Sequence, residues 1–154
     1  RCGRHFSLGV RLSPERFGLD TAEIQALAGR LLTDPRLDYL DMSLWDLDNP
    51  CEYREFDGKP LLEIFAALPR EGVKLGAAGK LYNAADCQRA LDHGCDFIMI
   101  GRGAVLHHDF PMRAIANNGF RTVDLPVTRE YLGEQGVSKT FADYLATWEG
   151  FVAD

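Results

Sequence analysis

The chain alternates short apolar runs with longer segments in which apolar residues recur every three or four positions. Short apolar runs are typical of strands covered on both faces, and the wider spacing is typical of amphipathic helices. The pattern predicts strands over residues 6–12, 39–43, 73–77 and 96–100. It predicts helices over residues 20–32, 60–68, 83–93, 109–117, 127–136 and 138–151.

Cap and turn residues support these helix ends. Asp20 is followed three residues later by Glu23, which is the capping-box pattern. Pro60 suits the first position of a helix, and Gly94 suits a helix end. The other predicted caps are Asn83, Thr128 and Ser138. The predicted buried face of the first helix comprises Ile24, Leu27, Ala28, Leu31 and Leu32.

Strands that alternate with helices indicate parallel strands joined by crossover helices. The predicted fold class is therefore α/β, with about four βα units that make up half of a (β/α)8 TIM barrel, plus C-terminal helices. Residues 1–154 are predicted to form one partial domain. Because a half barrel has open edges, three arrangements are possible. The chain is the C-terminal half of a larger barrel, it pairs with a second copy, or it closes as a small open sheet.

Composition narrows the function classes. The chain is 46% hydrophobic and 26% charged, and its net charge of -6 argues against a nucleic-acid surface. No apolar stretch is long enough to cross a bilayer, and residues 1–5 do not resemble a signal peptide. Cys2, Cys51, Cys87 and Cys95 lack CxxC spacing, which favours reduced cysteines and a cytoplasmic location.

Two neighbouring predicted strands end in small residues. The third ends in Gly76-Ala77-Ala78-Gly79 and the fourth in Gly101-Arg102-Gly103. Glycine lets backbone N–H groups approach a ligand closely, and arginine suits bidentate phosphate contact. In a (β/α)8 barrel, a phosphate commonly binds after the last two strands. The strand ends therefore predict a site for a phosphate-bearing cofactor or substrate.

Other polar residues allow less specific interpretations. Arg11 ends the first predicted strand, where it either points inward to an electron-rich partner or outward to an acid such as Glu15 or Asp41. His107 and His108 fit a polar connection better than a metal site, and His5 and His93 have no partner in sequence. Trp45, Asp46 and Asp48 either line a pocket or form a surface loop.

At these residues the chain resembles the Old Yellow Enzyme family of FMN-dependent NAD(P)H:flavin oxidoreductases, over nearly its whole length but only in the C-terminal half of those enzymes. The resemblance rests on Val10-Arg11-Leu12-Ser13-Pro14, Asp38-Tyr39-Leu40-Asp41-Met42-Ser43, Ala78-Gly79-Lys80, Ile100-Gly101-Arg102 and Arg129-Glu130-Tyr131-Leu132.

The resemblance implies an ene-reductase that binds FMN, uses NAD(P)H and reduces electrophilic alkenes or related small-molecule acceptors. It implies that Arg11 lies against the pyrimidine edge of the flavin, near N1 and O2. Ala78, Gly79 and Lys80, with Gly101 and Arg102, are implied to hold the FMN phosphate.

The resemblance also implies that the proton donor and the substrate-anchoring residues lie in the other half of the barrel. No catalytic residue is therefore assigned in this chain, and the chain alone is expected to bind FMN weakly and not to turn over. The expected partner is the missing half of the barrel or a second copy. Two alternatives stay open: an aldolase or isomerase that uses Lys74 on a phosphorylated metabolite, or a non-catalytic module that self-associates.

Overall fold

The fold is described from a computed structural model, which covers residues 6–15, 18–48, 50–51, 56 and 58–153. Cys2, His5 and the rest of the N-terminal segment considered for a signal peptide lie outside these residues. The chain divides into two compact units. The first comprises Arg1–Lys80 and Gln88–Met99, and the second comprises Leu81–Cys87 and Ile100–Asp154. That residues 1–154 form one partial domain stays a prediction.

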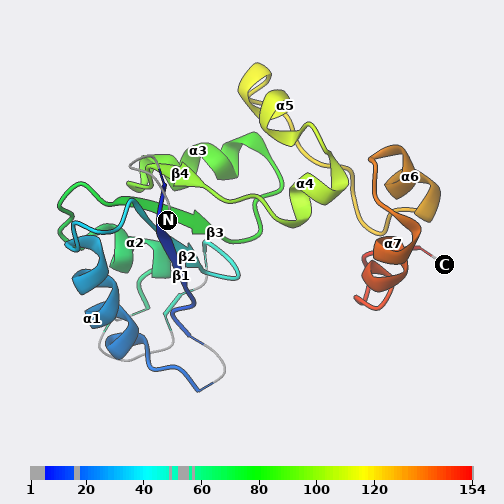
Figure 1. Ribbon diagram of the computed structural model, residues 1–154. Coiled ribbons are helices and arrows are strands. Elements are labelled where there is room, and N and C mark those ends of the chain that lie inside the picture. The colour runs from blue at the N-terminus through cyan, green and yellow to red at the C-terminus, as the bar shows by residue number, and fades with distance from the viewer. Residues whose placement is uncertain (1–5, 16–17, 49, 52–55, 57, 154) are drawn as a thin grey trace. The chain divides into compact units, whose positions relative to one another are not determined.

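The first unit contains a parallel four-stranded sheet in the order β1-β2-β3-β4 (Figure 1). The α/β prediction with parallel neighbouring strands is thereby confirmed. The second strand lies where it was predicted, the third is displaced by one residue, and the first and fourth are shorter than predicted. The strands are β1 (Gly9–Leu12), β2 (Tyr39–Ser43), β3 (Lys74–Ala78) and β4 (Phe97–Ile98).

The predicted helices are all present, mostly in a shorter form. They are α1 (Thr21–Leu32), α2 (Leu61–Ala66), α3 (Ala84–Asp92), α5 (Phe110–Ala116), α6 (Arg129–Glu134) and α7 (Lys139–Leu145). The predicted caps are confirmed where side chains accept backbone hydrogen bonds, at Asp20, Asn83, Thr128 and Ser138. Pro60 is the N-cap of α2 rather than its first residue.

The short helix α4 (Arg102–Leu106) was not predicted, because glycine disfavours a helix interior. The structure gives a packing reason for Gly103 within it. A Cβ at this position would lie 2.6 Å from the carbonyl oxygen of Leu81 and 2.9 Å from the ring of Phe110. Close packing therefore requires glycine here, and it overrides the local propensity.

The two faces of the sheet differ in character. Leu40, Met42, Leu75 and Ala77 are fully buried on one face, as expected where helices cover a parallel sheet. Helix α1 packs against β2 and α2. Within α1, Ala28 and Leu32 are fully buried, but the prediction for Leu27 is wrong, since it is 38% exposed.

The opposite face of the sheet is more open. Successive residues of a strand point to opposite faces of the sheet. This face therefore carries the strand residues that alternate with Leu40, Met42, Leu75 and Ala77. Arg11 and Tyr39 are both exposed there. This more open side, called the open face below, carries Gly9 and Arg11 of β1, Tyr39, Asp41 and Ser43 of β2, Gly76 of β3 and Phe97 of β4.

The second unit has its own apolar core. Helix α6 packs against α7, and α4 packs against α5. The parallel bridge between Val127 and Val152 brings the end of the chain beside the start of α6. The core consists of Leu106, Val127, Leu132, Ala142, Leu145 and Phe151.

Candidate functional site

Arg11 lies on the open face and is held by the neighbouring strand. Its Nε is 3.4 Å from Oδ2 of Asp41, and its Nη2 donates a hydrogen bond to Oγ of Ser43 at 2.9 Å. The Arg11 side chain is nevertheless 58% exposed. The predicted pairing with Asp41 is confirmed, and Arg11 presents its guanidinium on the face away from the buried Leu40 and Met42. An electron-rich partner for Arg11 stays a prediction.

Asp41 is the more unusual member of this pair. The residue is 3% exposed, and no described residue donates a hydrogen bond to its Oδ1. Burial raises the pKa of this carboxyl, and the positive charge of Arg11 opposes that rise. A buried carboxylate that has one ion pair and one unsatisfied oxygen is costly. Such groups are more frequent at functional sites than in ordinary cores.

Two aromatic rings and two glycines shape the rest of the open face. The Tyr39 and Phe97 rings meet edge to face, with centroids 5.6 Å apart. A Cβ at Gly9 would lie 2.1 Å from the Tyr39 ring, and one at Gly76 would lie 2.2 Å from the Phe97 ring. Gly76 is thus a strand residue that makes room for Phe97, and this corrects its interpretation as part of a terminal glycine turn.

The end of β3 carries three of the predicted phosphate contacts, Ala78, Gly79 and Lys80. The carbonyl oxygen of Ala78 accepts a hydrogen bond from the N–H of Leu44 at 2.8 Å. The Lys80 backbone is in the left-handed region, with φ of 48°, and its Nζ lies 2.9 Å from a carboxylate oxygen of Asp46. Left-handed non-glycine residues cost energy and recur at functional sites.

Gly79 has a structural role that the sequence did not reveal. A Cβ at this position would lie 2.8 Å from the backbone nitrogen of Leu47 and 3.0 Å from the carbonyl carbon of Asp46. The loop after β2 therefore occupies the space that the missing side chain leaves. This loop corresponds to the predicted segment of Trp45, Asp46 and Asp48, in which Trp45 is 50% exposed and has φ of 59°.

Gly101 and Arg102 belong to the second unit. Gly101 is the N-cap of α4, and a Cβ there would meet no atom within 4 Å. Arg102 is the first residue of α4, and its guanidinium carbon lies 5.9 Å from the ring centroid of Trp148. This cation–π contact places a cation next in sequence to the exposed Gly101. That these residues act with Gly79 and Lys80 on one phosphate stays a prediction.

The histidine pair after α4 is part of the packing. His107 is buried, and its Nε2 accepts a hydrogen bond from the Val123 N–H at 3.1 Å. Burial lowers the pKa of His107, so the neutral imidazole is favoured. Nδ1 of His108 lies 3.1 Å from Oε1 of Gln135. The described residues contain no cluster of side chains suited to a metal ion.

Lys74, the proposed nucleophile of the aldolase alternative, is at the wrong end of its strand. It is the first residue of β3, and its Nζ lies 3.0 Å from Asp96. Catalytic groups of parallel α/β folds lie at the C-terminal ends of strands. The ion pair with Asp96 is therefore a structural contact, and this observation disfavours the aldolase alternative.

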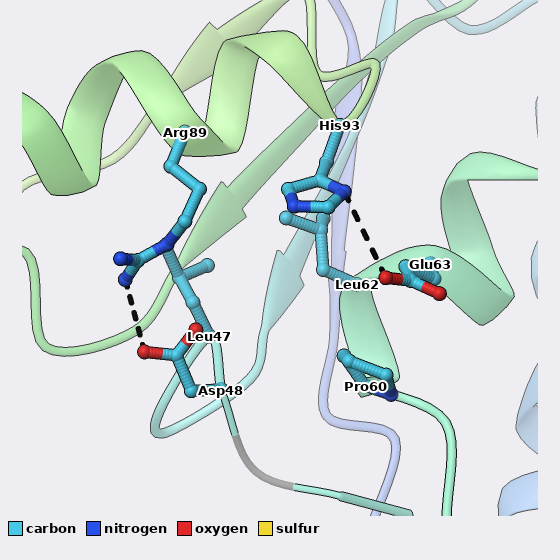
Figure 2. Close-up of a pocket in the computed structure, with 7 residues that line it drawn as sticks. All are labelled: Leu47, Asp48, Pro60, Leu62, Glu63, Arg89 and His93. Carbon is cyan, nitrogen blue, oxygen red and sulfur yellow. Dashed lines mark hydrogen bonds and ion pairs between the residues drawn. The ribbon is translucent and has the colours of Figure 1, made fainter.

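A small pocket lies elsewhere in the first unit, and Figure 2 shows its lining. Its volume is about 30 Å³, close to the space that one water molecule takes up. Two contacts cross it: Asp48 forms an ion pair with Arg89 at 2.9 Å, and a carboxylate oxygen of Glu63 lies 3.9 Å from Nδ1 of His93. The pocket is lined by Leu47, Asp48, Pro60, Leu62, Glu63, Arg89 and His93, and it is too small for a cofactor.

Sequence reasoning missed the part that Ser43 plays and gave Asp41 only as one possible partner of Arg11. The strand register pairs Arg11 with Asp41 directly, and Ser43 lies two residues further along the same face of β2. The detectable signal is an arginine and an acid at matching positions of consecutive parallel strands. The cysteines that the structure describes, Cys51, Cys87 and Cys95, are free and buried.

Comparisons with known proteins agree on one family. A curated relative, NADH:fumarate oxidoreductase of Klebsiella pneumoniae (strain 342), is 31% identical over 121 residues, which cover 72% of this chain and 12% of that protein. The structure of morphinone reductase in complex with tetrahydroNAD has a TM-score of 0.50 and 27% identity, over 80% of this chain and 31% of that chain. The resemblance to the Old Yellow Enzyme family is confirmed.

A second structure, of a morphinone reductase mutant with tetrahydroNAD, has a TM-score of 0.50 and 28% identity, over 75% of this chain and 30% of that chain. The fold prediction is thereby confirmed, because the parallel sheet and its helices match part of a TIM barrel. The chain thus spans about an eighth of the curated relative and less than a third of each solved structure. No protein-family model matches the chain.

Proposed function

We propose that the protein containing this chain is an FMN-dependent NAD(P)H oxidoreductase that reduces electrophilic alkenes or related acceptors. The observation that carries the proposal is the exposed guanidinium of Arg11, held on the open face by Asp41 and Ser43. A fixed positive charge on such a face favours a ligand that gains electron density. The likeness to NADH:fumarate oxidoreductase and morphinone reductase supports flavin and nicotinamide chemistry.

The residues of this chain fit such a cofactor in part. Arg11 would face the electron-rich edge of the flavin, and Gly101 has open space where a side chain would be. Gly79 and Lys80 fit less simply, because the loop after β2 contacts both. Its backbone lies where a Cβ of Gly79 would be, and its Asp46 carboxylate pairs with the Lys80 ammonium. For Ala78, Gly79 and Lys80 of the first unit, phosphate contact through backbone N–H groups is therefore proposed, and Gly101 and Arg102 are proposed separately as phosphate contacts of the second unit. The bound flavin would accept and donate the hydride.

The partners follow from the same proposal. Among the described residues, β1 and β4 are the edge strands of the sheet, so the remaining part of the barrel, or a second copy of the chain, would pair with these edges. The acidic net charge of -6 favours neither nucleic acid nor an anionic membrane as a partner. Among the described residues, no helix has the length and apolar character needed to cross a membrane. A cytoplasmic location is part of the proposal.

The test is a two-step reaction of the full natural gene product under anaerobic conditions. NADH or NADPH is expected to bleach the visible absorption of the oxidised flavin, because the flavin accepts the hydride. A cyclic enone is then expected to restore that absorption. A flavin-loaded protein that is bleached by neither nucleotide, or that no electrophilic alkene reoxidises, would contradict the proposal.

A further inference from the structure

The feature that the proposed function leaves unexplained is the buried carboxyl of Asp41. Asp41 is 3% exposed, and no described residue satisfies its Oδ1. Its only described ion pair is with Arg11. A buried carboxylate is costly, and apolar residues in place of a buried ion pair are often as stable or more stable, so packing of the sheet alone does not explain Asp41. Its presence therefore points to an effect on Arg11.

The register of the sheet explains how this effect is exerted. Arg11 and Asp41 are paired across β1 and β2, and Gly76 is paired with Asp41 on the other side. The Phe97 ring covers Gly76. The cross-strand neighbours of Asp41 are thus Arg11 on one side and Gly76, covered by the Phe97 ring, on the other. Among the described residues, Arg11 is the nearby positive charge that acts on Asp41.

Asp41 and Ser43 engage different nitrogens of the same guanidinium. Asp41 lies beside Nε, and Ser43 accepts a hydrogen bond from Nη2. Two contacts from one strand fix the plane of a guanidinium, whose donors have a rigid arrangement. These two contacts engage Nη2 and Nε, and the side chain is 58% exposed, so the group can also meet a ligand on the open face.

We propose that Asp41 and Ser43 are positioning residues for Arg11, and that Asp41 also moderates the positive field that Arg11 exerts on the bound flavin. This inference rests on the proposed function. Ser43 and Asp41 aim the guanidinium, and the Asp41 carboxylate offsets part of its charge. Removing that negative charge leaves Arg11 uncompensated, so the reduced flavin, which carries more electron density, is stabilised relative to the oxidised flavin.

The test compares Asp41→Asn with Asp38→Asn in the full natural protein. Asp38 precedes the same strand at its other end, where its Oδ2 accepts a hydrogen bond from the Leu8 N–H at 2.7 Å. Both changes remove one negative charge and keep the side-chain shape. We expect Asp41→Asn to increase the preference for reduced over oxidised FMN about tenfold, which raises the two-electron midpoint potential by about 30 mV. Asp38→Asn is expected to leave the potential unchanged.

A second variant keeps the inference testable if Asp41→Asn fails to fold. Ser43→Ala removes one contact to Arg11 without changing any charge, and we expect it to weaken the binding of oxidised FMN about threefold, or by about 0.6 kcal/mol. Equal potentials in Asp41→Asn, Asp38→Asn and the unmodified protein would overturn the inference. So would unchanged FMN affinity in Ser43→Ala. If the unmodified protein takes up no flavin, the proposed function itself is wrong, and this inference fails with it.

Discussion

Two glycines near the ends of β3 and β4 are expected to respond differently to the same substitution. In Gly79→Ala the new methyl group would lie 2.8 Å from the Leu47 nitrogen and 3.0 Å from the Asp46 carbonyl carbon. Both are backbone atoms, so rotation of a side chain cannot relieve the clash. In Gly101→Ala the new methyl group would meet no atom within 4 Å.

The magnitudes follow from these distances. The Gly79 contact falls about 0.6 Å short of the 3.4 Å at which ordinary van der Waals contact begins, so the loop after β2 has to move. Overpacking of this kind costs about 1–3 kcal/mol in the free energy of unfolding. Gly101→Ala is expected to change that free energy by less than about 0.5 kcal/mol, as for other uncrowded surface positions. If the Gly101 backbone contacts the phosphate, the methyl group of Gly101→Ala would hinder its close approach. This variant should then bind FMN at least about tenfold more weakly.

The assay is urea unfolding of the flavin-free full natural protein, followed by FMN titration with fluorescence detection. A lower urea midpoint with an unchanged slope is expected for Gly79→Ala alone. If Gly79→Ala unfolds at the same urea concentration as the unmodified protein, the close approach of the loop to Gly79 is wrong. If Gly101→Ala binds FMN as tightly as the unmodified protein, the phosphate assignment of Gly101 fails.

Three further predictions concern stability and reactivity. Leu132→Ala, at a fully buried position, should lower the free energy of unfolding by about 2–5 kcal/mol. Its control Leu91→Ala, at a position 38% exposed, should lower it by less than about 1 kcal/mol. Equal urea midpoints for the two variants would contradict the described core. Burial lowers the pKa of His107 in the folded protein below its usual 6.5. Below pH 6.5 the unfolded chain therefore binds more protons at this residue than the folded protein does. The free energy of unfolding is highest above pH 6.5 and decreases as the pH falls through the folded-state pKa. The urea midpoint should therefore drop more between pH 7.5 and 5.5 (roughly one unit either side of a free histidine's pKa) in the unmodified protein than in His107→Gln, and equal drops would refute the buried neutral imidazole. Burial raises the pKa of Cys87 and of Cys95 to about 11, so iodoacetamide should alkylate both on the order of a hundredfold more slowly in the folded than in the urea-unfolded protein, as mapped by mass spectrometry.

Local sequence signals predicted the elements whose ends are set locally. The Asp20 cap begins α1, the Asn83 side chain caps α3, and the apolar pattern placed β2 at Tyr39–Ser43. The two cap contacts join residues only two or three positions apart, and the apolar run of β2 is itself a local signal, although the strand pairs with distant strands. Cap chemistry and apolar spacing are therefore sufficient to predict them.

The missed features depend on contacts between distant parts of the chain. Helix α4 contains Gly103, although glycine has a low helix propensity. Only glycine fits at this position, because the carbonyl oxygen of Leu81 lies where a Cβ would clash. The role of Gly79 depends on a loop more than thirty residues earlier in the sequence. The pairing of Arg11 with Asp41 depends on the register of two strands that a helix separates. Sequence patterns do not determine such distances.

The FMN cofactor of the proposed function is tested most directly by the visible absorption spectrum of the full natural gene product as purified. We expect visible flavin absorption bands and a released cofactor that co-elutes with FMN rather than FAD. Arg11→Gln should then release the cofactor more readily. A colourless protein that also fails to take up added FMN would contradict the account.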